Sequence, residues 1–297
     1  MSTGPGAQPD TGAGSFQRRG AALIAGAALL WSTGGLFIKL APMPGLAVAG
    51  ARAAITVFFY LIVLRPKLSQ ARWSTAIAYA GMILTFVTAT KLTSAANAIF
   101  LQYTGPAYVL VLSPWLLKEP MRRRDVLPIA LSLFGLSLFF VGKMEPGHAL
   151  GNALGAASGL FFGLSVLLLR RDAKTGAGDA IPSTTLGNAL AALIAIPLSL
   201  GALHTAFTAP SPAPLLALGG LLWLGVVQMG VAYLLFARGL KRVPAAEASL
   251  VSMLEPLLSP LWVFLGTGER PTAWALAGGA VVLGSVLLRT LGDRDPA

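Results

Sequence analysis

Long apolar runs dominate the chain, and short polar or basic segments separate them. A helix that crosses a bilayer needs about 20 mostly apolar residues, because the hydrocarbon core is about 30 Å thick. Runs of this length predict an all-α membrane protein with ten transmembrane helices, at 20–40, 45–64, 73–91, 94–117, 125–142, 150–170, 183–201, 214–238, 245–266 and 272–289. Because nine similar runs follow the first one, we interpret it as a span and not as a cleaved signal peptide.

Composition agrees with a chain that has lipid as its solvent. Hydrophobic residues make up 55% of it, charged residues 11%, and the mean hydropathy is +0.74. Soluble domains carry roughly a quarter charged residues, so this chain is too apolar to be one of them. The polar, Gly- and Pro-rich residues 1–19 are predicted to form a disordered tail.

The positions of lysine and arginine predict the orientation in the membrane. With the N-terminus inside, 17 of the 22 basic residues fall in cytoplasmic segments, four fall outside and Arg52 lies within a span. Basic residues favour cytoplasmic loops, so both termini are predicted to be cytoplasmic in a multi-pass protein of the bacterial inner membrane. The net charge of +11 is spread over every cytoplasmic turn, which argues against a nucleic-acid partner.

Several chemistries have no residues or motifs to support them. The chain has no cysteine and two histidines, His148 and His204, which are predicted to lie in loops. Without cysteine there are no disulfides or thiolate sites, and no phosphate-binding loop is present for ATP hydrolysis. We therefore predict no catalytic residues, no metal site and no cofactor.

The chain contains a weak internal repeat at an offset of 150 residues. Pro106 falls on Pro256, Glu119 on Glu269, and Lys91 on Lys241, with several alanine and leucine matches around them. Each half then holds five helices, and an odd number inverts the second half relative to the first, as in many transporters. The predicted division is a tail at 1–19, a first repeat at 20–143, a second repeat at 144–291 and a tail at 292–297.

Both halves have a proline near the middle of the fourth helix. Pro106 and Pro256 lack the N–H that would bond the carbonyls of Gln102 and Ser252. Free carbonyls are tolerated at membrane depth only where protein or water satisfies them. We predict hinges beside a binding cavity at these two prolines; a packing kink without a ligand role is the alternative.

These motifs carry a family resemblance. Residues 236–288 hold a positive turn, an alanine-rich helix start, the residues LEP in mid-helix, GER at the outer end and a glycine-rich last helix. The first half has a weaker copy at 93–120, in which Gly105 replaces the glutamate and KEP replaces GER. This pattern resembles an EamA-type transporter of the drug/metabolite transporter superfamily. The resemblance implies ten helices in two inverted repeats around a central cavity, and bacterial members commonly export amino acids and other small metabolites.

Polar and aromatic residues within the spans are candidates to contact a substrate. Ser252, Glu255 and Ser259 share one face of a helix, and a polar stripe in a membrane helix faces the protein interior or a wet cavity. Hydrogen bonds between helices are the alternative for the polar groups, and core packing is the alternative for Trp31. The predicted substrate-binding residues are Trp31, Asn97, Gln102, Tyr103, Thr104, Tyr108, Gln228, Tyr233, Ser252 and Glu255.

Four charged residues have open roles. Glu255 is a protonated carboxyl that bonds across helices, a proton-coupling site, or a ligand for a substrate ammonium group. Arg52 either extends to the membrane surface or anchors a substrate carboxylate. Glu119 and Glu269 lie at span ends and are predicted to form surface ion pairs or caps.

A glycine strip predicts close helix packing. Gly151, Gly155, Gly159 and Gly163 recur every four residues, so a neighbouring helix can approach closely along this face. The pair Ala280 and Gly284 repeats the spacing once. We predict that it serves either static helix packing or the interface of a homodimer.

We therefore expect a secondary transporter that exports small amphiphilic metabolites by alternating access, above all amino acids with aromatic or other apolar side chains. The candidate wall is polar and aromatic without clustered cations, which suits a zwitterion better than a polyanion. Protons are a candidate coupling ion. The alternatives are a multidrug or other metabolite permease of the same fold, a channel, or an intramembrane lipid-modifying enzyme.

Overall fold

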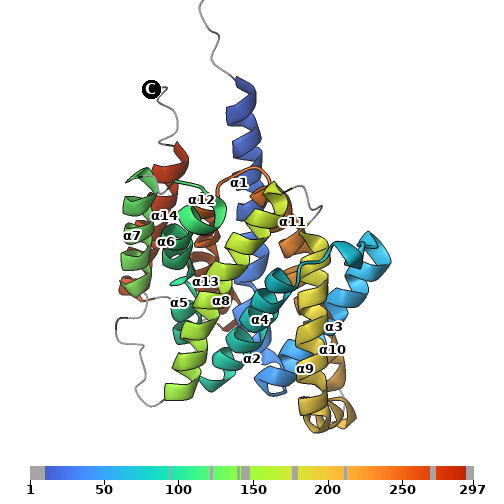
Figure 1. The fold of residues 1–297 in the computed structure, drawn as a ribbon. Helices are drawn as coiled ribbons and strands as arrows, with labels where there is room; N and C mark the ends of the chain where they lie inside the picture. The colour runs from blue at the N-terminus through green and yellow to red at the C-terminus, as the bar shows by residue number, and fades with distance from the viewer. Residues whose placement is uncertain are drawn as a thin grey trace, which may run out of the picture.

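The described part of the chain is helical and contains no strand. The computed structural model describes residues 11–93, 95–120, 123–138, 141, 148–175, 180–210, 213–267 and 272–291. Its α-helices are α1 (Thr11–Ser32), α2 (Gly34–Leu40), α3 (Gly45–Phe59), α4 (Trp73–Leu92), α5 (Ala95–Gln102), α6 (Gly105–Leu117), α7 (Arg123–Leu138), α8 (Ala149–Lys174), α9 (Ile181–Thr208), α10 (Ala213–Leu222), α11 (Ala232–Leu240), α12 (Ala245–Ser252), α13 (Leu254–Thr267) and α14 (Ala273–Leu291). Two π-helices, η1 (Tyr60–Leu64) and η3 (Trp223–Val231), and a 3₁₀ turn, η2 (Leu68–Gln70), complete the set. α1 begins and α14 ends at the same end of the molecule (Figure 1).

Six stretches of the described residues are long and apolar enough to cross a membrane: Ser15–Leu40, Gly45–Leu64, Trp73–Leu92, Ala149–Lys174, Ile181–Thr208 and Pro214–Leu240. The predicted spans 94–117 and 245–266 are each divided into two short helices, and α7 has 16 residues. The structure thus supports a multi-pass membrane protein, while the count of ten spans stays a prediction.

The first helix begins earlier than expected. α1 starts at Thr11, so residues 11–19, assigned to a disordered tail, are helical; residues 1–10 and 292–297 lie outside the described residues. Interactions with α12 and with the turn before it explain the extension. Gln17 donates a 2.6 Å hydrogen bond to Glu247, and the Arg242 guanidinium lies 5.1 Å from the centre of the Phe16 ring. His204 was also misassigned, since it lies within α9 and not in a loop.

Three helical rods are interrupted by single turns. The rod α5–α6 breaks at Tyr103 and Thr104, and the rod α12–α13 breaks at Met253, which is 150 residues beyond Tyr103. At both breaks a backbone N–H bonds the carbonyl three residues back, as in a 3₁₀ turn. The prolines predicted to cause hinges, Pro106 and Pro256, lie in the first turn of α6 and α13. The third break, at Thr33 between α1 and α2, has no proline and no counterpart at this offset.

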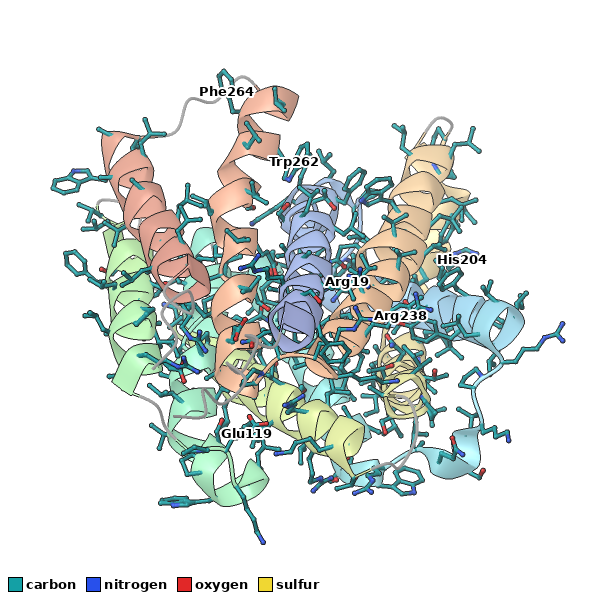
Figure 2. All side chains as sticks on the ribbon, turned by 90° about the horizontal axis from the view of Figure 1, so that it is seen from above. Arg19, Glu119, His204, Arg238, Trp262 and Phe264 are labelled. Carbon is teal, nitrogen blue, oxygen red and sulfur yellow. The ribbon has the colours of Figure 1, made fainter. Side chains whose placement is uncertain are left out.

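The two halves of the chain pack against each other along their length. α4 packs on α8 and on α9, α3 packs on α9, α7 on α14, and α1 on α11. Viewed from above, α1 lies between the α12–α13 rod, which carries Trp262, and α11, which carries Arg238 (Figure 2). The core therefore lies between the halves and not within each of them.

The glycine strip of α8 receives the broken rod α5–α6. A methyl group at Gly155 would lie 3.0 Å from Leu101, and one at Gly163 would lie 3.0 Å from the Gly105 carbonyl. At Gly159 it would lie 2.5 Å from the Leu101 carbonyl. The close approach predicted from the four-residue spacing is therefore present at the helix break. Nothing described lies within 4 Å of a methyl group at Gly284.

Ion pairs join several helices at the end of the molecule where α1 begins and α14 ends. Arg289 of α14 bonds Asp125 of α7 at 2.5 Å and Glu247 of α12 at 3.3 Å. Glu119 pairs with Arg170 at 2.9 Å and accepts a 3.2 Å hydrogen bond from the Ala245 N–H, the first residue of α12. The ion-pair and capping role predicted for Glu119 is thus confirmed, whereas Glu269 lies outside the described residues.

Large apolar side chains cover much of the outer surface. Trp115 is 78% exposed, and Leu193, Leu198 and Leu216 are each 72% exposed. Such a surface would be costly in water and is favourable in lipid. It agrees with the multi-pass assignment.

Candidate functional site

A small cavity lies between the two halves of the chain. Its volume is about 30 Å³. Among the described residues it is lined by Trp31, Arg52, Met82, Ile83, Phe86, Gln102, Phe162, Gln228, Met229, Tyr233 and Glu255. These residues come from helices in both halves, and Gln102 and Glu255 lie next to the two proline-associated breaks.

One tyrosine hydroxyl connects the two breaks. The Tyr103 hydroxyl lies 2.9 Å from the Ser252 carbonyl and 2.6 Å from Oε2 of Glu255. The Ser252 carbonyl is the one that Pro256 deprives of its helical donor, so the first half supplies the missing hydrogen bond. A phenol has one proton, so it donates to one of these two oxygens at a time. The breaks are therefore held to each other across the protein interior.

The π-helix η3 presents Gln228 and Met229 to the cavity. Thr56 donates a 2.8 Å hydrogen bond to the Gly225 carbonyl, and Tyr60 donates one of 2.9 Å to the Gly230 carbonyl. These bonds fix the widened helix against α3 and η1. Nη1 of Arg52 then donates a 3.1 Å hydrogen bond to Oε1 of Gln228. The π-helical geometry of η3 was not predicted, because no pattern of residues in this segment indicates it.

A glycine beside the α1–α2 break makes room for the Gln228 amide. A methyl group at Gly34 would lie 2.7 Å from Nε2 of Gln228, so any larger side chain there would require the Gln228 amide to move. The break itself is fixed by two indoles: Trp223 donates to the Thr33 hydroxyl at 2.9 Å, and Trp262 to the Ser32 hydroxyl at 2.7 Å.

Aromatic rings form one side of the cavity. The Trp31 ring centre lies 4.7 Å from that of Tyr233 and 5.0 Å from that of Phe236. Tyr233 also meets Tyr79 edge-on at 4.8 Å. The Trp31 indole N–H is buried and has no hydrogen-bond partner within the described residues. An indole usually finds a partner when buried, so this N–H requires a ligand, a water or a movement of its neighbours to be satisfied.

The structure gathers only part of the predicted substrate-binding set. Five of the ten predicted residues line the cavity: Trp31, Gln102, Gln228, Tyr233 and Glu255. Tyr103 and Ser252 lie next to Glu255: the Tyr103 hydroxyl contacts both the Glu255 carboxyl and the Ser252 carbonyl.

Asn97, Thr104 and Tyr108 do not line this cavity, and a contact between them and a substrate stays a prediction. Asn97 bonds Thr93 at 3.2 Å and Asn152 at 3.4 Å, between α5 and α8. Thr104 lies against Gly159 of α8, and Tyr108 is 38% exposed. Tyr108 also lies against Gly163, so all three residues face α8 on both sides of the break at Tyr103 and Thr104.

Apolar lining residues were missed because their sequence context has no distinguishing signal. Met82 and Phe86 on α4 are one turn apart, and Phe162 lies between two glycines of the α8 strip. An apolar residue that faces a cavity looks the same in sequence as one that faces lipid.

Arg52 was predicted either to extend to the membrane surface or to anchor a substrate carboxylate. The structure excludes its extension to the surface, since the residue is 2% exposed.

The cavity has two charged side chains among the residues that line it, and they are opposite in sign. Arg52 and Glu255 form no ion pair within 4.0 Å. In this geometry each can bind a complementary charge on a ligand. No group of three or more His, Cys, Asp or Glu side chains in the described ranges could hold a metal ion.

Comparison with known proteins assigns the chain to a family. The model of the EamA-like transporter family matches twice, at residues 18–141 and 149–291. An uncharacterized transporter from Archaeoglobus fulgidus is 30% identical over 209 residues, which cover 69% of this chain and 71% of that protein. A protein of known crystal structure has the same fold, with a TM-score of 0.73, 21% identity, and coverage of 93% of this chain and 99% of that one. The chain therefore belongs to the EamA-like transporter family.

Proposed function

We propose that this membrane transporter exports small amphiphilic metabolites, above all amino acids with aromatic or other apolar side chains. The observation that carries the proposal is the cavity between the halves, where Arg52, Glu255, two glutamines, four aromatic rings and two thioethers meet. Polar groups at such a site orient a ligand, and apolar groups receive its side chain. The lining has no cluster of cations, so a polyanionic substrate is disfavoured.

Transport by alternating access would use the broken rods. Ligand pockets for molecules of drug size have volumes of roughly 300–1,000 Å³. The 30 Å³ cavity is much smaller, with room for about two waters. A substrate therefore enters only when the rods separate, and Tyr103 with its two partners lies where this separation begins. Proton coupling through Glu255 is compatible with the arrangement.

The membrane arrangement proposed here has ten spans in two inverted five-helix repeats. The doubled family match and the breaks 150 residues apart support it. Both termini are proposed to face the cytoplasm of a bacterial inner membrane, because the basic residues gather at that end. A cysteine introduced at Lys241 should react with an impermeant thiol reagent from the cytoplasm alone, and one at Lys39 from the outside alone; the reverse pattern would overturn this orientation.

Counterflow in proteoliposomes tests the function. Vesicles loaded with unlabelled L-phenylalanine should accumulate labelled L-phenylalanine transiently, and the initial rate should saturate with concentration. Empty vesicles are the control. A rate that rises linearly without saturation would indicate a channel, and no uptake of any of the twenty amino acids would reject this substrate class. Uptake of unrelated cationic drugs instead would favour the multidrug alternative.

A further inference from the structure

Arg52 is a buried cation with most of its hydrogen-bonding capacity unused. It is 2% exposed, and the one hydrogen bond that its guanidinium makes within the described residues is to the neutral Gln228. Its Nε has no partner there. A guanidinium has five N–H donors in a planar fork that fits a carboxylate. The side chain also lines the cavity, so its free donors and a ligand can meet.

The other buried arginine shows what structural pairing looks like in this chain. Arg289 is 3% exposed, and it binds the carboxylates of Asp125 and Glu247. Buried charges are paired because removing them from water is costly. Arg52 is equally buried but has no carboxylate within 4.0 Å among the described residues. The unpaired guanidinium therefore requires an anion that this part of the chain does not provide.

Glu255 provides the opposite charge across the cavity. Tyr103 bonds its Oε2, and Oε1 has no partner within the described residues. Since Glu255 does not pair with Arg52, the two charges can be bridged by a molecule that carries both signs. The apolar part of such a molecule would then lie against Trp31, Phe86, Phe162 and the two methionines of the lining.

We propose that Arg52 binds the carboxylate of the transported substrate while Glu255 binds its ammonium group, so that the cavity selects α-amino acids as zwitterions. This inference rests on the proposed transport function, and it adds the two anchoring residues and the orientation of the substrate. A zwitterion leaves the charge of the site balanced. A ligand that lacks its carboxylate leaves Arg52 buried and unpaired, and a ligand that lacks its ammonium group does the same to Glu255.

Three probes with the same aromatic group test this selection in the wild-type protein. Unlabelled L-phenylalanine, L-phenylalaninamide and 3-phenylpropanoate compete with labelled L-phenylalanine in the counterflow assay. The amide lacks the negative charge, and the propanoate lacks the positive one. We expect each analogue to compete at least about 30-fold less well than L-phenylalanine, the loss typical of removing one partner of a buried charge pair.

Variants at two positions locate the effect. Arg52→Gln should lower the apparent affinity for L-phenylalanine about 30-fold or more and leave that for the amide unchanged, while Arg52→Lys should restore part of it. Gln228→Glu has nearly the same shape as the wild-type side chain and gives Arg52 a carboxylate at the position now 3.1 Å from Nη1. It should therefore weaken L-phenylalanine binding without loss of thermal stability. Arg238→Gln, at an exposed position, is the charge control and should change nothing.

The outcomes separate this proposal from the transport proposal. If the wild type shows no counterflow of any amino acid, the function itself is wrong. If it transports L-phenylalanine but accepts the amide equally well, or if folded Gln228→Glu binds L-phenylalanine like the wild type, the function stands and the anchoring role of Arg52 is rejected. If Arg52→Gln does not fold, the wild-type competition series and Gln228→Glu still decide.

Discussion

Removal of the Tyr103 hydroxyl should destabilise the protein and slow transport. Tyr103→Phe keeps the ring, which is 1% exposed, and deletes the group that lies 2.9 Å from the Ser252 carbonyl and 2.6 Å from Glu255. An average hydrogen bond between membrane helices contributes about 0.6 kcal/mol. This one should contribute more, because Pro256 leaves the carbonyl without a helical donor. A buried acceptor left unsatisfied costs about 1–3 kcal/mol.

Unfolding of the purified protein in mixed micelles measures this cost. Helix content followed by circular dichroism during titration with sodium dodecyl sulfate gives the free energy of unfolding of each variant. We expect Tyr103→Phe to lower it by about 2 kcal/mol, which is roughly a 30-fold change in the folded-to-unfolded ratio. Counterflow should also slow, because the breaks are no longer held at a defined distance.

Tyr79→Phe is the matched control. Tyr79 is 0% exposed, and the polar groups next to its hydroxyl are the side chains of Asn188 and Tyr233, not a backbone carbonyl freed by a proline. Deleting it should cost no more than about 0.6 kcal/mol, the contribution of an average hydrogen bond between membrane helices, since no proline-freed carbonyl is left unsatisfied. Equal effects of the two substitutions, or a Tyr103→Phe protein with wild-type stability and transport, would refute the connection between the breaks.

Three further predictions follow from the packing and the ion pairs. Gly159→Ala places a methyl group 2.5 Å from a backbone carbonyl of α5 and should lower the free energy of unfolding by about 1–3 kcal/mol. Gly284→Ala has open space around the added methyl group and should not lower it, so equal stability of the two variants would contradict the close helix contact. Pro256→Ala restores a backbone hydrogen-bond donor to the helix and should reduce the turnover rate more than the expression level. Pro197→Ala, inside the uninterrupted α9, should leave the turnover rate unchanged, and an unaltered rate for Pro256→Ala would reject the hinge. Arg289→Gln removes the cation that two buried carboxylates share and should cost about 3–5 kcal/mol in the same unfolding titration, so a stable variant would show that the pairs contribute little.

Hydropathy and proline positions predicted the parts of the fold that have strong local causes. The apolar runs located the helices, and the prolines at 106 and 256 located the two breaks. The free carbonyl of Ser252 was also predicted, although its partner, Tyr103, was not, because the contact joins residues 149 positions apart. The break at Thr33 escaped prediction because it depends on hydroxyl groups and on indoles from distant helices.

The candidate site was predictable only where polarity marks it. Glu255, Gln228 and Gln102 are conspicuous in apolar spans, since polar groups there need a partner. Arg52 was noticed, but its role depends on which groups surround it, and sequence does not give those. Thr104 and Tyr108 lie against the glycine strip of α8 instead, because a polar residue at a helix contact looks the same in sequence as one in a cavity.

Accessibility of a single cysteine in the cavity tests the central claim most directly. The chain has no cysteine of its own, so Phe86→Cys places one unique thiol in the lining. In oriented proteoliposomes, a membrane-impermeant thiol reagent should reach this residue from either side, in separate experiments, and L-phenylalanine should slow both reactions. Reaction from one side only, or no protection by L-phenylalanine in a protein that transports it, would contradict a substrate site with alternating access between the two halves.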